Sequence, residues 1–210
     1  MKAESTKSEQ NVKREKIEWC DMRWFNADDN SLPRVLLIGD SIVVGYSTKV
    51  QEQLDGTANV ARLATSKCIC DKALIKELDY AFCDYKYEVV HFNNGLHGWS
   101  FTEEDYADSF PVFFDHLKQL AKDAALIWGS STPLRYRDNR EQLDAERNPR
   151  VLARNRIAQQ FLSEHNVIIN DLYGLMVEHP ELCTDGAHFN SDGYTIMANA
   201  VCKHILSQCQ

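Results

Sequence analysis

The chain has 210 residues and a mass of 24.1 kDa, which fits one domain able to bury roughly 70% of its unfolded surface. Hydrophobic residues make up 44% and charged residues 26% of the chain, a composition that excludes intrinsic disorder of the whole protein. The formal net charge of -8 argues against a general nucleic-acid partner, and no apolar run is long enough to cross a membrane.

The N-terminus is polar and contains no apolar stretch typical of a signal peptide. The chain as it stands therefore indicates a soluble, cytoplasmic protein, or a periplasmic or secreted one if an export signal has been trimmed. Its 7 cysteines are scattered, and an odd set of this kind does not indicate a disulfide framework. Cys68-Ile69-Cys70 lacks a second pair at ligand spacing, so buried side chains are favoured over a metal or redox site. We expect no metal and no cofactor.

Residues 1–33 precede the first apolar run. Residues 1–16 mix charges of both signs and predict a polar tail. Residues 17–33 contain aromatic side chains among acids and asparagines, and predict a lead-in segment that packs one or two aromatic rings against the domain. We therefore divide the chain into a tail and lead-in segment, residues 1–33, and a folded domain, residues 34–210.

From residue 34 onward, short apolar runs alternate with longer amphipathic stretches. The short runs indicate buried strands and the longer stretches indicate helices. This alternation predicts an α/β fold, with a parallel sheet of five strands and helices on both faces. The predicted strands are 34–38, 58–63, 87–92, 124–128 and 167–169, and the predicted helices are 44–54, 71–80, 103–122 with a break or kink at Pro111, 151–165, and 191 or 192 to 207.

Polar residues gather where the predicted strands end, at 39–41, 93–97, 129–133 and 170–171. Ligands of parallel α/β sheets bind outside the carboxyl ends of the strands. We therefore expect the functional site at this edge of the sheet. Residues 134–150, rich in charged residues and asparagine, predict an exposed excursion.

Ser41 follows the first predicted strand and opens a predicted helix. Locally, a serine there is more often the helix N-cap than a nucleophile. Gly39 permits a sharp turn, and the helix dipole and free amides would favour a nucleophile at this position. Asp185 and His188 are three residues apart, so a turn can place the carboxylate beside the imidazole. An aspartate and a histidine at this spacing, with no other motif beside them, are more often structural.

Taken in chain order, these motifs resemble the SGNH, or GDSL-type, esterase superfamily over most of residues 34–206. Gly39-Asp40-Ser41-Ile42 follows the first strand, an asparagine cluster follows the third, and residues 185–194 match the last block of the family. The resemblance implies a flavodoxin-like three-layer α/β/α sandwich and acyl-ester hydrolysis without a metal.

The resemblance also implies roles for individual residues. Ser41 would be the nucleophile, His188 the general base, and Asp185 the carboxylate that orients His188. The oxyanion would be bound by the backbone N–H of Ser41 and an asparagine side chain. Asn94 aligns best with that asparagine, and Asn93 is its rival by a shift of one residue.

The sequence departs from the family where a glycine amide is expected to join this oxyanion hole. Ala64 stands at that position and still carries an N–H, while Ser66 is a possible neighbour of the substrate. His97 and Trp99 follow the third strand, where Trp99 could stack on a sugar, line an acyl pocket or anchor a loop. Arg135 suits an anionic or polyhydroxylated substrate, or a solvated loop.

We expect a serine esterase that removes short acyl groups, acetyl in particular, from a small-molecule or carbohydrate ester. The polar loops at the strand ends and the absence of a long apolar stretch favour this substrate class. Because fold does not fix substrate, a lipase or thioesterase of the same superfamily and a non-catalytic binding protein remain alternatives. A flavin- or nucleotide-binding protein is disfavoured because no glycine run that cradles phosphate occurs. The oligomeric state is left open.

Overall fold

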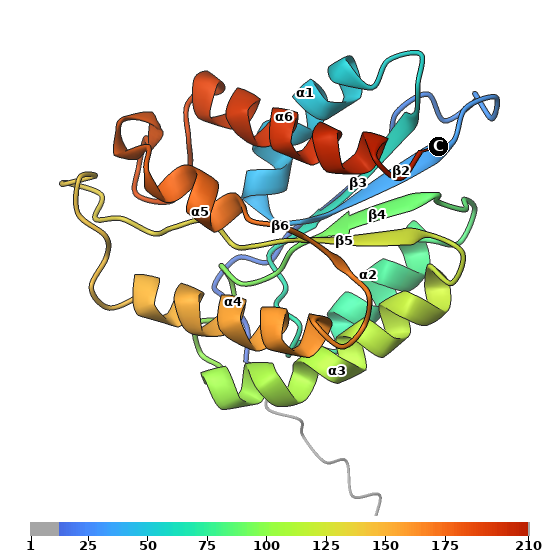
Figure 1. Cartoon of the computed structure of the whole chain (residues 1–210). Coiled ribbons are helices and arrows are strands. Elements are labelled where there is room, and N and C mark those ends of the chain that lie inside the picture. The colour runs from blue at the N-terminus through green and yellow to red at the C-terminus, as the bar shows by residue number, and fades with distance from the viewer. Residues whose placement is uncertain (1–12, 210) are drawn as a thin grey trace, which may run out of the picture.

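The sheet of the computed structural model, which describes residues 13–209, contains six strands in the order β1-β3-β2-β4-β5-β6 (Figure 1). The five predicted strands are all present and pair in parallel. Most of the predicted polar tail, residues 1–12, lies outside the described residues. The strands are β1 Cys20–Trp24, β2 Arg34–Gly39, β3 Asn59–Thr65, β4 Val89–Phe92, β5 Ala125–Gly129 and β6 Ile168–Asn170.

The sixth strand, β1, comes from the lead-in segment and corrects the predicted sheet of five strands. It pairs antiparallel with β3, with Asp21 opposite Ala64. Its sequence alternates too little to indicate a strand, so pairing with β3 rather than local pattern produces it. The indole N–H of Trp24 donates to the hydroxyl of Tyr87 at 2.9 Å, so this segment does pack an aromatic ring against the domain.

Helices cover both faces of the sheet, which confirms the three-layer arrangement (Figure 1). Helices α1, α5 and α6 cover one face, and α2, α3 and α4 cover the other. Among residues 13–209, no helix is both long and apolar enough to span a membrane. The helices are α1 Ser41–Gln53, α2 Ala73–Ala81, α3 Glu103–Leu120, α4 Asn148–Leu162, α5 Leu172–Val177 and α6 Ser191–Leu206, with a short 3-10 turn at Pro180–Leu182.

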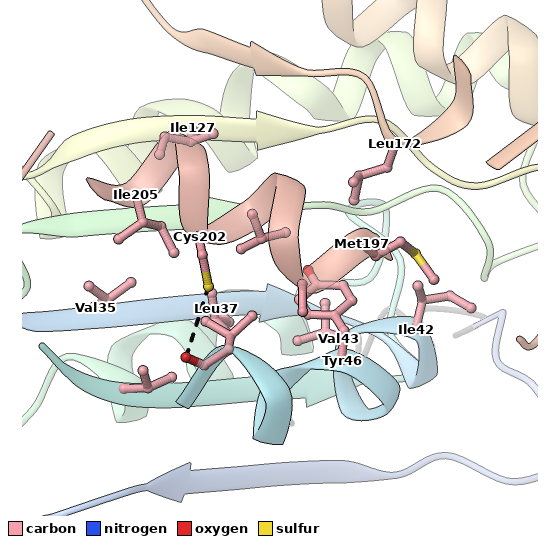
Figure 2. Packing of buried hydrophobic residues seen from close by; sticks show 14 of the residues in the cluster. Val35, Leu37, Ile42, Val43, Tyr46, Ile127, Leu172, Met197, Cys202 and Ile205 are labelled. Atoms are coloured by element: carbon pink, nitrogen blue, oxygen red, sulfur yellow. Dashed lines mark hydrogen bonds between the residues drawn. The ribbon is translucent and has the colours of Figure 1, made fainter. Parts of the chain in front are cut away.

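Strand β2 supplies both hydrophobic cores. Val35 and Leu37 pack beneath α1 and α6, in what we call the α1/α6 core (Figure 2). Leu36 and Ile38 point to the opposite face, into the α2–α4 core. All four side chains are at most 2% exposed, which explains why the strand reads as one continuous apolar run.

One prediction outside the sheet is confirmed and another needs correction. The helix predicted over 103–122 is present as α3, Glu103–Leu120, and is not broken at Pro111. The segment 134–150 is only partly an exposed excursion, since Arg135 pairs with Leu143 in a short bridge and the side chain of Arg135 is buried.

Candidate active site

Ser41 is the first residue of α1, directly after the buried strand β2. The helix is capped by Asp40, whose Oδ1 accepts a hydrogen bond from the N–H of Ile42 at 2.9 Å. The interpretation of Ser41 as the N-cap is therefore wrong, and its hydroxyl is left for another partner. Because the first amides of a helix lack carbonyl partners within it, the Ser41 N–H can serve a ligand.

The structure brings together the three side chains that the family resemblance implies. Oγ of Ser41 lies 2.8 Å from Nε2 of His188, and Nδ1 of His188 lies 2.9 Å from Oδ2 of Asp185. With the carboxylate accepting from Nδ1–H, the lone pair of Nε2 faces the serine hydroxyl. The side chains of His188 and Asp185 are each 41% exposed, so the group opens directly to solvent.

The loop before α6 holds Asp185 in place. Its Oδ1 accepts from the N–H groups of Ala187, at 3.1 Å, and His188, at 2.9 Å, which leaves Oδ2 for the imidazole. Partial burial raises the pKa of Asp185, but the hydrogen bonds from His188 and Ala187 outweigh it and lower the pKa to about 2. Gly186 has φ +95°, and a Cβ there would lie 2.5 Å from the carbonyl oxygen of Arg135, so the turn requires glycine.

Asn93 is buried at the carboxyl-end edge of the sheet. It lies beside the end of β2, since a Cβ added to Gly39 would be 3.8 Å from the Cβ of Asn93. Its amide nitrogen donates to the carbonyl of Gly129 at 2.6 Å and contacts Oγ of Ser131 at 3.1 Å. Both amide hydrogens of Asn93 thus have partners.

Asn94 points to the loop that follows β3. Its amide nitrogen donates to the carbonyl of Lys67 at 2.9 Å, and its Oδ1 accepts from the N–H of Ile69 at 3.2 Å. One amide hydrogen of Asn94 remains without a partner among the described residues. Ala64, in contrast, is fully buried inside β3, with Gly39 of β2 and Asp21 of β1 as its register partners, so its N–H stays a predicted oxyanion donor without a contact that supports it.

Two of the four substrate-binding candidates are structural. Ser66 is 2% exposed, and its hydroxyl holds the lead-in segment through Glu18 and the backbone of Trp19. Arg135 is 3% exposed, and its guanidinium donates to backbone carbonyls, including that of Val177. Neither side chain is free to bind a substrate, because each is turned inward.

The other two candidates lie on the loop between β4 and α3. Nδ1 of His97 lies 2.9 Å from a carboxylate oxygen of Glu15. The guanidinium groups of Arg150 and Arg154 both lie over the ring of Trp99, at 5.4 Å and 4.9 Å from its centroid. Of the readings open for Trp99, these contacts favour a loop anchor. Sequence reasoning missed Glu15 and Arg154, which reach this loop only through tertiary contacts.

The residue before Ser41 carries a buried carboxyl group. Burial raises the pKa of Asp40, and the imidazoles of His97 and His188 offset only part of this rise. Oδ2 of Asp40 has no hydrogen-bond partner among the described residues. Both imidazoles are therefore within electrostatic reach of the first turn of α1.

The sequence model of GDSL-like lipases and acylhydrolases matches residues 81–201, more than half of the chain. The chain belongs to the GDSL-like lipase/acylhydrolase family. The matched region contains Asp185 and His188 and begins after Ser41, whose place beside them comes from the structure. Comparison with curated proteins finds no match in sequence.

Solved structures share the fold of this GDSL-like chain. The acetyl xylan esterase AlAXEase is 17% identical with a TM-score of 0.66, over 82% of this chain and 99% of that one. A lipase/acylhydrolase from Enterococcus faecalis is 18% identical with a TM-score of 0.65, over 83% and 96%. A carbohydrate esterase family 3 protein from Talaromyces cellulolyticus is 14% identical with a TM-score of 0.65, over 84% and 98%. At these identities, the likeness establishes the fold.

Proposed function

We propose that this acylhydrolase-family chain is a serine esterase that removes short acyl groups, acetyl in particular, from carbohydrate esters. The observation that carries the proposal is one continuous line of hydrogen-bonded atoms. It runs from Oδ2 of Asp185 through the imidazole of His188, at 2.9 Å, to Oγ of Ser41, at 2.8 Å.

In this proposal each step of ester hydrolysis is assigned to one residue. Nε2 of His188 takes the hydroxyl proton as Oγ of Ser41 attacks the ester carbonyl carbon. Asp185, ionised because its pKa is low, stabilises the imidazolium. His188 then protonates the leaving alcohol as the ester C–O bond breaks, which leaves an acyl-Ser41. Water, deprotonated by His188, attacks this acyl group, releases the carboxylic acid and restores Ser41.

The tetrahedral oxyanion needs donors at the same edge of the sheet. The N–H of Ser41 at the start of α1 supplies one, assisted by the helix dipole. For the side-chain donor, hydrogen-bond counting favours Asn94, which keeps an amide hydrogen without a partner, over Asn93, which has two partners. The position of Asn93 beside Gly39 keeps it as the rival.

Two features support a short acyl group on a polar alcohol. The side chains near Ser41 at this edge of the sheet include polar ones, among them Asn93 and Asn94. The exposed triad leaves room for a large alcohol, and an acetyl xylan esterase and a carbohydrate esterase are among the structures that share this fold.

The test is hydrolysis of p-nitrophenyl esters from acetyl to dodecanoyl by the wild type and Ser41→Ala. We expect acetyl to be preferred and kcat to fall by roughly 10⁴–10⁶ in the variant, because the nucleophile is lost. Ser207→Ala, which removes an exposed hydroxyl at the end of α6, is the matched control and should retain full activity.

A preference for long acyl chains would replace this proposal with a lipase or thioesterase. Activity of Ser41→Ala within a few-fold of wild type would exclude Ser41 as the nucleophile. If the wild type hydrolyses none of the p-nitrophenyl esters and no acetylated sugar, a non-catalytic binding protein becomes the better explanation.

A further inference from the structure

A second imidazole–carboxylate pair lies at the same edge of the sheet as the triad. Nδ1 of His97 is 2.9 Å from Oε1 of Glu15, and the N–H of Gly98 donates to the same oxygen at 3.2 Å. His97 follows β4 and Ser41 follows β2, and these strands are neighbours. The proposed triad does not use this pair.

The pairing decides what the other ring nitrogen of His97 can do. Because the carboxylate of Glu15 accepts the hydrogen of Nδ1, the neutral ring presents a lone pair on Nε2. In His188 the corresponding lone pair faces the hydroxyl of Ser41. Nε2 of His97 has no hydrogen-bond partner within residues 13–209, and its side chain is 18% exposed. It is a free acceptor that solvent can reach.

The backbone around His97 is held by Arg154 of α4. Arg154, which is 1% exposed, donates to the carbonyl oxygens of Gly95 at 3.1 Å, His97 at 2.6 Å and Gly98 at 3.2 Å. The indole ring of Trp19 meets the imidazole edge-on, with 6.2 Å between centroids. Contacts with Arg154, Trp19 and Glu15 therefore hold the backbone and the ring of His97 in one orientation before a substrate binds.

We propose that Nε2 of His97, oriented by Glu15, accepts a hydrogen bond from a free hydroxyl group on the alcohol part of the substrate. This inference rests on the proposed esterase function and deepens it. A site built to pair with a hydroxyl group discriminates strongly against an ester that lacks one, because its own acceptor is then left without a partner. His97 thus selects polyhydroxylated esters, while the triad performs the chemistry on any ester it can reach.

The experiment compares two substrates with the same acyl group. Methyl β-xyloside carrying one acetyl group retains free hydroxyls, whereas p-nitrophenyl acetate has none. For His97→Leu we expect kcat/KM on the xyloside to fall about 10- to 100-fold, mainly through KM, in line with the loss of a hydrogen bond to the substrate. Activity on p-nitrophenyl acetate should stay within about twofold of wild type.

Further variants separate this role from a structural one. Glu15→Gln should give a smaller loss in the same direction, and His97→Gln, whose amide oxygen restores an acceptor, should recover part of the activity. His116→Leu breaks another imidazole–carboxylate pair, with Asp79 on α2, and is the matched control that should change neither substrate. An equal loss on both substrates, or no loss on either, would overturn the proposal.

A binding measurement decides the inference independently of catalysis. Calorimetric titration of unacetylated methyl β-xyloside into Ser41→Ala should give binding that the added His97→Leu change weakens about tenfold. Equal binding to both proteins would overturn the role of His97. A wild type that hydrolyses neither ester would refute the proposed function, yet this titration would still test the hydroxyl contact.

Discussion

Asp185 accepts three hydrogen bonds, from two backbone amides and from the imidazole of His188. These bonds favour the ionised carboxylate more than partial burial disfavours it, which is why the pKa falls to about 2. The carboxylate is therefore charged at neutral and mildly acidic pH. Its charge is in place before any proton leaves Ser41, so the triad needs no rearrangement to support the imidazolium.

The identity of the oxyanion donor gives a prediction for a single residue. Asn94→Ala should lower kcat by about 10²–10³ with little change in KM, because the donated hydrogen bond strengthens as charge develops on the oxygen. Steady-state kinetics with p-nitrophenyl acetate measures this. Asn93→Ala should instead mainly lower Tm, because it removes the bonds to Gly129 and Ser131.

The reverse pattern would transfer the role to Asn93. That pattern is a kcat of Asn93→Ala below that of Asn94→Ala, measured at a temperature where both variants are fully folded. The sequence alone could not separate the two residues. Their different neighbours, Gly129 at the end of β5 for Asn93 and Lys67 after β3 for Asn94, are far away in the chain.

Strand β1 is held against β3 by an ion pair as well as by backbone hydrogen bonds. Arg62 of β3 is 4% exposed at its side chain, and it donates to Oδ2 of Asp21 in β1 at 2.6 Å and to Oγ of Ser47 in α1 at 2.8 Å. The carboxylate of Asp21 therefore pairs with a buried cation and adds a side-chain contact to the backbone pairing of β1 with β3.

Asp21→Ala should lower the free energy of unfolding by about 1–3 kcal/mol, because it leaves a buried guanidinium partly without a partner. Urea denaturation followed by circular dichroism measures the change. Asp138→Ala, on the exposed part of the 134–150 segment, is the control and should stay within about 0.5 kcal/mol of wild type. A loss in Asp21→Ala no larger than in this control would show that the contact does not stabilise the edge of the sheet.

The sequence predicted best those elements whose burial requires a recognisable run of apolar residues. β2 is buried on both faces and reads as a continuous apolar run, whereas β1 lies at the edge and has no such run. Arg135 was expected at the surface because its side chain is charged, but its guanidinium finds backbone carbonyls inside the fold. Nothing in the local sequence signals partners of that kind.

At the scale of the molecule, the parallel sheet assembles the site. The carboxyl ends of β2 and β4 share one edge, so the loops that carry Ser41 and His97 leave the sheet side by side. The order of polar clusters along the chain was enough to predict this edge. It was not enough to predict the contact of His97 with Glu15, since those residues are separated by 82 positions and meet only in the folded chain.

The two cores share strand β2, and this predicts how the whole domain unfolds. Leu36 faces the α2–α4 core and Leu37 the α1/α6 core, and each is 0% exposed. Leu36→Ala and Leu37→Ala should each lower the free energy of unfolding by about 2–5 kcal/mol, through lost burial and the cavity left behind. Val112→Ala, at a side chain 66% exposed on α3, is the control and should change it by less than about 0.5 kcal/mol.

Both leucine variants should still unfold in one transition, because neither layer of helices can keep its apolar face covered once the shared strand is lost. Tryptophan fluorescence, which reports Trp128 in the α2–α4 core and Trp24 packed against it together with Trp19 and Trp99, and far-ultraviolet circular dichroism, which reports all helices, should give the same midpoint in urea. A fluorescence midpoint in Leu36→Ala well below the dichroism midpoint would show that the α2–α4 layer unfolds alone. In that case β2 would not couple the two cores.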